Sequence, residues 1–344
     1  MQRTVVPFGN ISKLAFVNQR NVQCLSVRRL SYTRNLGNEQ SSQGPTKSNQ
    51  MEDFEKDEMK IISIPINRQQ NYLHFIQNDQ LLKFDNKIAI IEKKVAAKAA
   101  NFWNGMKASD KAISKFLVKN IEKLLDRVPW SEQSYASIPF EQFLIKRRSE
   151  TELAKKTFPG KEHISFVEYM QMTSNNPTLI QHIKDHSIIR PIKIYSPKIP
   201  GVIENDRDVS KRFYDLAEKN SKYYRKEMYK CMLALPLTFP LAIIPLVPNV
   251  PGFYLCYRLY WNLKAHAGCN HIMQMYHKNN GASFQIEYVP EFSDIYRDLY
   301  NETTRKIEIS TEKQEQSFEK LAKIMEFDPV KANVLKAVLK ENYE

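Results

Sequence analysis

Two groups of histidines hold the side chains best suited to metal chemistry. The first has the pattern H-x-x-D-H, which on a helix puts both imidazoles on one face, and the second combines two histidines with a thiol. Neither group has a fourth ligand at a suitable spacing, so we expect hydrogen-bonded or surface histidines and no metal centre. The groups consist of His182, Asp185 and His186, and of His266, Cys269 and His271.

Other catalytic signatures are missing from the sequence. Its nine glycines form neither a G-x-x-x-x-G-K run followed by Ser or Thr nor a G-x-G-x-x-G run, and no G-x-S-x-G elbow presents a nucleophile. The four cysteines show no C-x-x-C spacing, which argues against a disulfide framework or a thiolate zinc site. We therefore predict that the chain is not an enzyme and uses no cofactor.

The most distinctive feature is an uncharged run from residue 231 to residue 257, bracketed by Lys230 and Arg258. As a straight helix it would reach about 40 Å, more than the hydrocarbon core of a bilayer at about 30 Å. Five prolines inside it, Pro236, Pro240, Pro245, Pro248 and Pro251, make a straight helix improbable, since each costs about 3 kcal/mol in a regular helix. We predict one membrane segment, either a re-entrant hairpin or a single kinked span. A buried helix pair of a soluble domain is the alternative.

The flanks of this run are rich in amphipathic rings, which favour the depth of lipid headgroups, and in lysines, which suit anionic lipid. The rings are Tyr223, Tyr224 and Tyr229 on one side and Tyr254, Tyr257, Tyr260 and Trp261 on the other. Membrane lipid is therefore an expected partner. The break between the two arms of a hairpin is expected from Pro248 to Gly252.

The same run carries a resemblance to a known family. The segments L-P-L-T-F-P from residue 235, P-L-V-P-N-V-P from residue 245 and F-Y at residue 253, ending in Tyr257-Arg258, resemble the fungal and plant family called mitochondrial potassium/proton exchange-related. Weaker similarity at Ile64-Pro65 and at residues 127–129 extends the likeness over roughly residues 60–289. The resemblance implies an inner-membrane protein associated with electroneutral potassium/proton exchange and with matrix cation and volume homeostasis.

The segment has few groups that could handle ions. An antiporter needs a site that alternately holds a proton and an alkali cation, usually an embedded carboxylate. Thr238, Asn249 and the carbonyls freed by the prolines could hold a potassium ion but cannot titrate near neutral pH. We therefore expect a regulatory or assembly subunit with protein partners in an exchange complex. A homo-oligomer that borrows ionisable groups from flanking helices is the alternative that would make it the exchanger.

Residues 1–36 have the composition of a mitochondrial presequence. They contain arginines, serines and scattered apolar residues but no acidic residue, and their best apolar run, residues 14–17, is too short for a secretory signal. Arg28 and Arg29, just before Ser31, are the predicted processing residues. The expected location is the matrix-facing side of the inner membrane, and the alternative is a disordered basic tail.

The remaining chain predicts a helix-rich α+β fold. Residues 37–59 read as a disordered linker, and an amino-terminal α+β region follows over residues 60–207. It contains a strand at residues 60–66, helices at 87–125 split near Gly105 and Ser109, and a proline-bounded strand at 192–195.

The second half begins with a basic helix that leads into the uncharged run. Together with the run, a following helix and a strand at residues 283–289, this helix makes up residues 208–290. Residues 291–344 read as a charged helical tail, in which Asp328 and Pro329 mark the start of an amphipathic helix that caps the domain or docks a partner.

The net charge of +13 raises a second class of function. A basic, tyrosine-rich stretch at residues 211–230 would suit a peripheral matrix protein that binds RNA or the ribosome. Nucleic acid is the less favoured partner, because six of the excess positive charges lie in the acid-free first 36 residues. Retention on membranes after a carbonate wash separates this alternative from membrane attachment.

Overall fold

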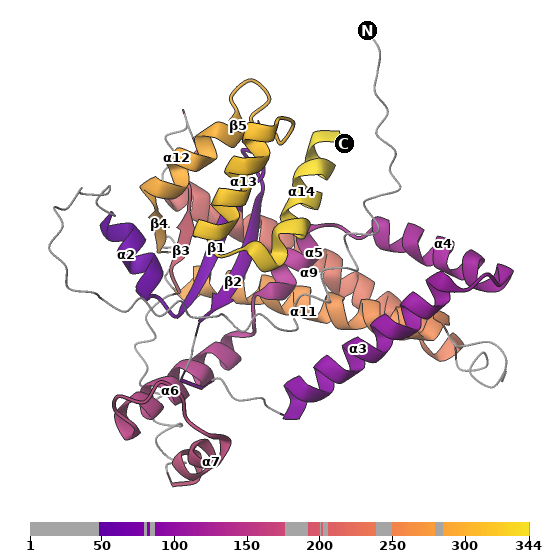
Figure 1. The fold of residues 1–344 in the computed structure, drawn as a ribbon, viewed down its shortest axis with the longest axis horizontal. Coiled ribbons are helices and arrows are strands. Elements are labelled where there is room, and N and C mark those ends of the chain that lie inside the picture. Colours follow the sequence, from indigo (N-terminus) through magenta and orange to yellow (C-terminus); the bar gives the residue numbers. More distant parts are fainter. Residues whose placement is uncertain are drawn as a thin grey trace, which may run out of the picture.

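A computed structural model describes most of the chain beyond the amino-terminal segment. The described residues are 48–78, 81–82, 87–175, 192–199, 201, 206–238, 250–278 and 285–343. They form a helix-rich α+β fold in which a small sheet lies between two layers of helices (Figure 1). The predicted fold class is therefore confirmed in its α+β part. The presequence residues Arg28 and Arg29 lie outside the described residues.

The sheet has four strands in the order β2-β1-β3-β4. Strand β1 (Met59–Pro65) is antiparallel to β2 (Asn71–Gln77) and parallel to β3 (Ile194–Ser196), which is parallel to β4 (Ile286–Tyr288). All residues of β1 are buried, because helices cover both faces of this central strand. The three strands predicted from sequence are present, each within a few residues of the expected place.

One face of the sheet is covered by helices from the two ends of the described chain. These are α2 (Asn49–Lys56), α12 (Pro290–Leu299), α13 (Glu312–Ile324) and α14 (Lys331–Tyr343). Ile62 and Ile64 of β1 enter this core with Phe292 and Val334. Residues 291–344, predicted as a charged tail, thus supply much of one core, and α14 packs on the domain as a cap.

A short hairpin and a turn complete that layer. Strands β5 (Tyr300–Asn301) and β6 (Lys306–Ile307) pair in antiparallel fashion, and a 3-10 turn at Asp328–Val330 leads into α14. The turn agrees with the helix start predicted from Asp328 and Pro329.

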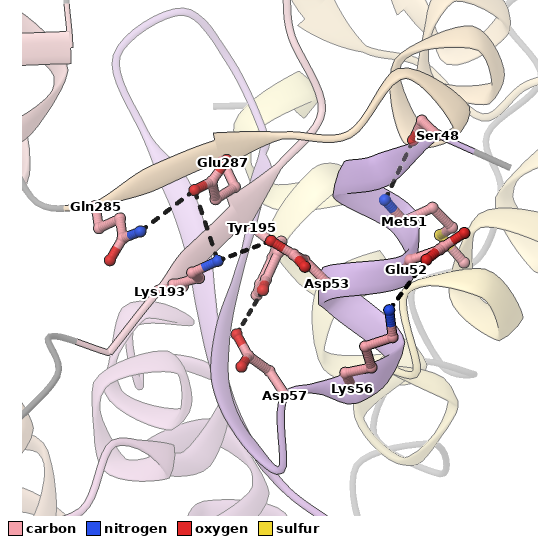
Figure 2. Close-up of polar contacts among 10 residues, drawn as sticks. All are labelled: Ser48, Met51, Glu52, Asp53, Lys56, Asp57, Lys193, Tyr195, Gln285 and Glu287. Atoms are coloured by element: carbon pink, nitrogen blue, oxygen red, sulfur yellow. Dashed lines mark hydrogen bonds and ion pairs between the residues drawn. The ribbon is translucent and has the colours of Figure 1, made fainter.

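Helix α2 corrects the linker prediction for residues 37–59 in its described part. Phe54 is fully buried and its ring packs edge-to-face on two others. The distance between ring centroids is 5.1 Å to Tyr195 and 5.0 Å to Phe292. Figure 2 shows the polar contacts at its rim, where the Tyr195 hydroxyl donates to Asp57 at 2.5 Å and Lys193 pairs with Asp53 at 3.1 Å. Met51 and Phe54 lie three residues apart, so both face inward from the helix. The mixed charges around them made this stretch resemble a linker.

The opposite face of the sheet packs on three helices. These are α5 (Ser131–Ser137), α9 (Asp206–Ala234) and α11 (Val250–Lys278), and the last two lie side by side below the sheet in Figure 1. Ile61 and Ile194 of the sheet enter this second core with Phe213 and Ile272 of the helices. Because Ile61 and Ile62 point to opposite faces, the strand ties both cores together.

The other helices lie outside these two layers. Helices α3 (Lys87–Ala108) and α4 (Ala112–Asp126) contact each other. The chain leaves the first helix after Ala108, close to the break predicted from Gly105 and Ser109. Helices α6 (Glu141–Thr157) and α7 (Phe166–Asn175) form a separate small pair (Figure 1).

Serines of α5 cover the free edge of β2. Ser134 Oγ accepts from the Leu73 N–H at 2.8 Å and donates to the Leu73 carbonyl at 2.9 Å, while Ser137 Oγ accepts from the Phe75 N–H at 3.3 Å. These hydroxyls take the place of a further strand, and an exposed edge that could pair with another chain is avoided.

We expect Ser134→Ala to lower the free energy of unfolding by about 1–3 kcal/mol, because both buried backbone groups of Leu73 would lose their partner. Urea denaturation measures the change. Ser137→Ala, which removes the longer bond, should cost less. Equal stability of the wild type and the Ser134 variant would contradict this account of the edge.

Candidate functional site

The uncharged run lies at the turn between α9 and α11. Helix α9 ends at Ala234, a 3-10 turn follows at Pro236–Thr238, and α11 begins at Val250. The two helices pack along each other as an antiparallel pair, here called the hairpin. Among the described residues, no helix is both long enough and apolar enough to cross a bilayer. The predicted membrane segment is therefore not confirmed.

The predicted site residues divide into three groups. Pro236 and Pro251 are exposed, and Tyr254 is half-buried near the start of α11. Thr238 and Arg258 are buried, and the Thr238 hydroxyl donates to the Leu235 carbonyl at 2.7 Å. The remaining four, Pro240, Pro245, Pro248 and Asn249, lie outside the described residues.

A polar network holds the two helices of the hairpin together. Ser221 Oγ lies 3.0 Å from His266 Nδ1 and donates to Asn270 Oδ1 at 3.0 Å, while the Asn270 amide lies 3.2 Å from His266 Nε2. Burial lowers the pKa of His266, so the network favours the neutral imidazole. Among the described residues, no carboxylate is hydrogen-bonded to this imidazole. The network therefore serves to hold the two helices together.

The second histidine group of the sequence does not converge. His266 faces Ser221, His271 Nδ1 lies 2.7 Å from the Pro139 carbonyl, and Cys269 is buried in the core below the sheet. Burial raises the pKa of the Cys269 thiol, so it stays protonated. In the described part of the chain, no three His, Cys, Asp or Glu side chains are placed to hold a metal ion. The first group, residues 182–186, falls in a stretch that is not described.

The strongest electrostatic feature of the hairpin is a buried ion pair. Arg258 Nη1 lies 2.6 Å from Glu132 Oε1, and the two side chains are only 8% and 3% exposed. Burial raises the pKa of Glu132, whereas the guanidinium of Arg258 acts in the opposite direction. The second oxygen, Oε2, is buried and has no hydrogen-bond partner among the described residues. The carboxylate thus depends on Arg258 for its compensation.

Aromatic side chains surround this pair. Burial raises the pKa of Tyr257 to about 12, and the Tyr224 hydroxyl lies 2.7 Å from Ser131 Oγ, next to Glu132 in α5. A cleft beside the pair is also lined by Trp130 and by Lys336 of α14. The pair therefore lies between α5 and the hairpin, beside a cleft that α14 also lines.

Glu132 was missed by the sequence reasoning. Arg258 is among the residues that the sequence predicts for the site, as the charged end of the uncharged run, whereas Glu132 lies far from it in the chain. The available signal was a single arginine among apolar and aromatic residues, because a charge that becomes buried there needs a partner of opposite charge. Which acid it meets depends on tertiary packing.

Residues 60–276 match the family described as mitochondrial K+-H+ exchange-related. This chain belongs to that family. The match runs from β1 to near the end of α11 and includes both members of the Glu132–Arg258 pair. The resemblance predicted from the prolines and Asn249 is thereby confirmed, and the family description relates the chain to mitochondria and to potassium/proton exchange.

Two fungal proteins are similar to this K+-H+ exchange-related chain. The uncharacterized protein YDL183C of Saccharomyces cerevisiae is 29% identical over 241 residues, which cover 70% of this chain and 69% of the yeast protein. The uncharacterized protein C23H3.12c of Schizosaccharomyces pombe is 25% identical over 210 residues, or 61% of this chain and 72% of the relative. No solved structure matches the chain.

Proposed function

We propose that the protein works at the mitochondrial inner membrane, facing the matrix, as a regulatory or assembly subunit of potassium/proton exchange. The family supplies the link to exchange. One observation favours a subunit over an exchanger. Glu132 of α5, a buried carboxylate that contacts the hairpin, is occupied by an ion pair. Its ion pair with Arg258 is formed, whereas an exchanger needs a carboxylate free to hold a proton and a potassium ion in turn.

The other buried carboxylate in the described residues supports the same proposal. Glu150 of α6 accepts a hydrogen bond from the Tyr169 hydroxyl at 2.8 Å and lies 3.8 Å from Lys146. Each of these two carboxylates is thus already engaged by neighbouring side chains, whereas an exchanger has to leave its carboxylate open to protons and cations. We therefore propose that the ion pathway belongs to partner proteins.

Loss of the protein is expected to slow potassium/proton exchange in isolated mitochondria severalfold. Passive swelling in potassium acetate measures the exchange rate, because acetic acid carries protons inward and potassium enters only as protons leave. Swelling in ammonium acetate is the control, since ammonia crosses the membrane without an exchanger. Re-expression of the wild-type chain should restore the potassium-dependent rate.

The subunit role has a separate test. The purified full-length chain in liposomes is expected to give little or no coupled flux of potassium and protons. Robust exchange by the purified chain would overturn the subunit role and make the protein the exchanger. Unchanged potassium acetate swelling in mitochondria that lack the protein would overturn its part in exchange altogether.

A further inference from the structure

Large apolar side chains are exposed at the end of the hairpin. Leu233 is 78% exposed, Leu237 77% and Phe253 66%, although each is of a type that folding normally buries. Met232 and Tyr229 beside them are also exposed. We call this surface, formed by residues 229–238 of α9 and the turn after it and by residues 250–257 of α11, the hairpin tip. It carries no acidic side chain.

Basic side chains adjoin the hairpin tip. Arg225 and Lys226 are exposed on α9, about two turns before Leu233. Lys230, at the inner edge of the tip, is exposed and paired with Glu227 at 2.6 Å. Helix α11 contains no acidic residue along its whole length, and Glu227 is the acid nearest the tip on α9. The described surface at this end of the molecule is therefore apolar at its extremity and positively charged behind it.

We propose that the hairpin tip docks on the surface of an anionic phospholipid bilayer, with its apolar side chains below the headgroups and neither helix crossing. Leu233, Leu237 and Phe253 would gain from leaving water, and Arg225 and Lys226 would lie near the phosphates. Arg258, one helical turn further in, is not offered to the lipid because Glu132 already compensates it. The proposal rests on the proposed function, which places the protein at a membrane.

Two features favour lipid over RNA or another protein as the occupant. RNA would bind the basic residues through its phosphates, but it would leave Leu233 and Leu237 exposed to water, because phosphates and sugars do not bury apolar surface. The order of the side chains, apolar at the extremity and basic about two turns behind, matches the order of acyl chains and phosphates in a bilayer leaflet. A protein partner imposes no such order.

Flotation of the purified full-length chain with vesicles tests the proposal. We expect binding to vesicles of phosphatidylcholine with phosphatidylglycerol and at least about tenfold weaker binding to phosphatidylcholine alone, since each basic residue contributes to attraction by anionic lipid. The double variant Leu233→Asp with Leu237→Asp should bind the anionic vesicles about a hundredfold more weakly, because two apolar anchors are lost.

The matched control is Phe140→Asp with Phe143→Asp. These phenylalanines at the start of α6 are also about half exposed but lie outside the tip, so binding should be unchanged. A charge variant, Arg225→Glu with Lys226→Glu, should weaken binding to the anionic vesicles at least about tenfold while leaving the apolar anchors intact. Thermal unfolding of each variant checks that the fold is retained.

Three results would overturn the proposal. They are equal binding to both kinds of vesicle, unchanged binding by the tip variant, and binding to single-stranded RNA with none to vesicles. The proposed function can fail separately. Lost vesicle binding together with slowed swelling in mitochondria that lack the protein would leave the function standing without this docking surface. Tight anionic binding with normal swelling would leave the docking surface without that function.

Discussion

Arg258→Met is expected to lower the free energy of unfolding by about 3–5 kcal/mol. The substitution keeps most of the apolar stem but removes the charge that compensates Glu132, and an unpaired buried carboxylate costs this much. Urea denaturation of the purified chain at neutral pH measures the loss. The penalty should shrink as the pH falls, because Glu132 binds a proton more tightly in the folded state than in the unfolded chain once its partner is gone.

The double variant separates the loss of a pair from the loss of one partner. Arg258→Met combined with Glu132→Gln should recover most of the stability, since no buried charge is left unpaired. The comparison pair is Lys222 with Glu218, which lie 2.8 Å apart but are 64% and 43% exposed. Lys222→Met should cost less than about 1 kcal/mol. A similarly small cost for Arg258→Met would refute the buried pair as a stabilising contact.

Gly268→Val is expected to prevent stable folding or to cost more than about 4 kcal/mol. Gly268 lies where α11 crosses the end of α5, and a Cβ there would overlap the carbonyl oxygen of Tyr135 and lie 3.2 Å from that of Ile138. Both are backbone atoms of the chain that covers the β2 edge, so they cannot turn aside as a side chain would. Even Gly268→Ala should be strongly destabilising, as thermal unfolding would show.

Gly105 provides the matched control for the helical glycine. It lies in α3, and a Cβ there would meet nothing within 4 Å. Gly105→Ala should therefore leave stability unchanged or raise it by up to about 1 kcal/mol, because alanine is the better helix former. If both substitutions had the same effect, the close approach at Gly268 would be wrong.

Local features of the fold could be predicted from the sequence. The isoleucine run of β1, the break of the long helix near Gly105 and the helix start at Asp328 each depend on a few neighbouring residues, and all three are present. The family could also be predicted, because its mark is the spacing of prolines around Asn249 in one continuous run.

Features that depend on distant contacts could not be predicted. The sequence predicts a linker where α2 lies, because a short stretch of mixed charge with two inward-facing apolar residues, Met51 and Phe54, resembles disorder until its docking partners are known. Glu132 carries no local mark of its pairing with Arg258. Gly268 did carry a signal, since a glycine inside a helical pattern often marks a close approach, but the crossing element could not be named.

The strand order of the sheet has a consequence for how the protein folds during synthesis. Ile61 pairs with Ile194, and Ile194 pairs with Ile286, so each central contact joins segments that leave the ribosome far apart in time. A nascent chain shorter than about residue 286 lacks β4 and the three carboxy-terminal helices, so α2 is the one described helix of that layer available to cover Ile62 and Ile64. Such contacts form slowly, because the chain loses the entropy of closing a long loop before the contacts stabilise it. The core that contains Ile61 and Ile272 can therefore form before synthesis is complete, whereas the core that contains Ile62 and Phe292 must wait for the carboxy-terminal helices.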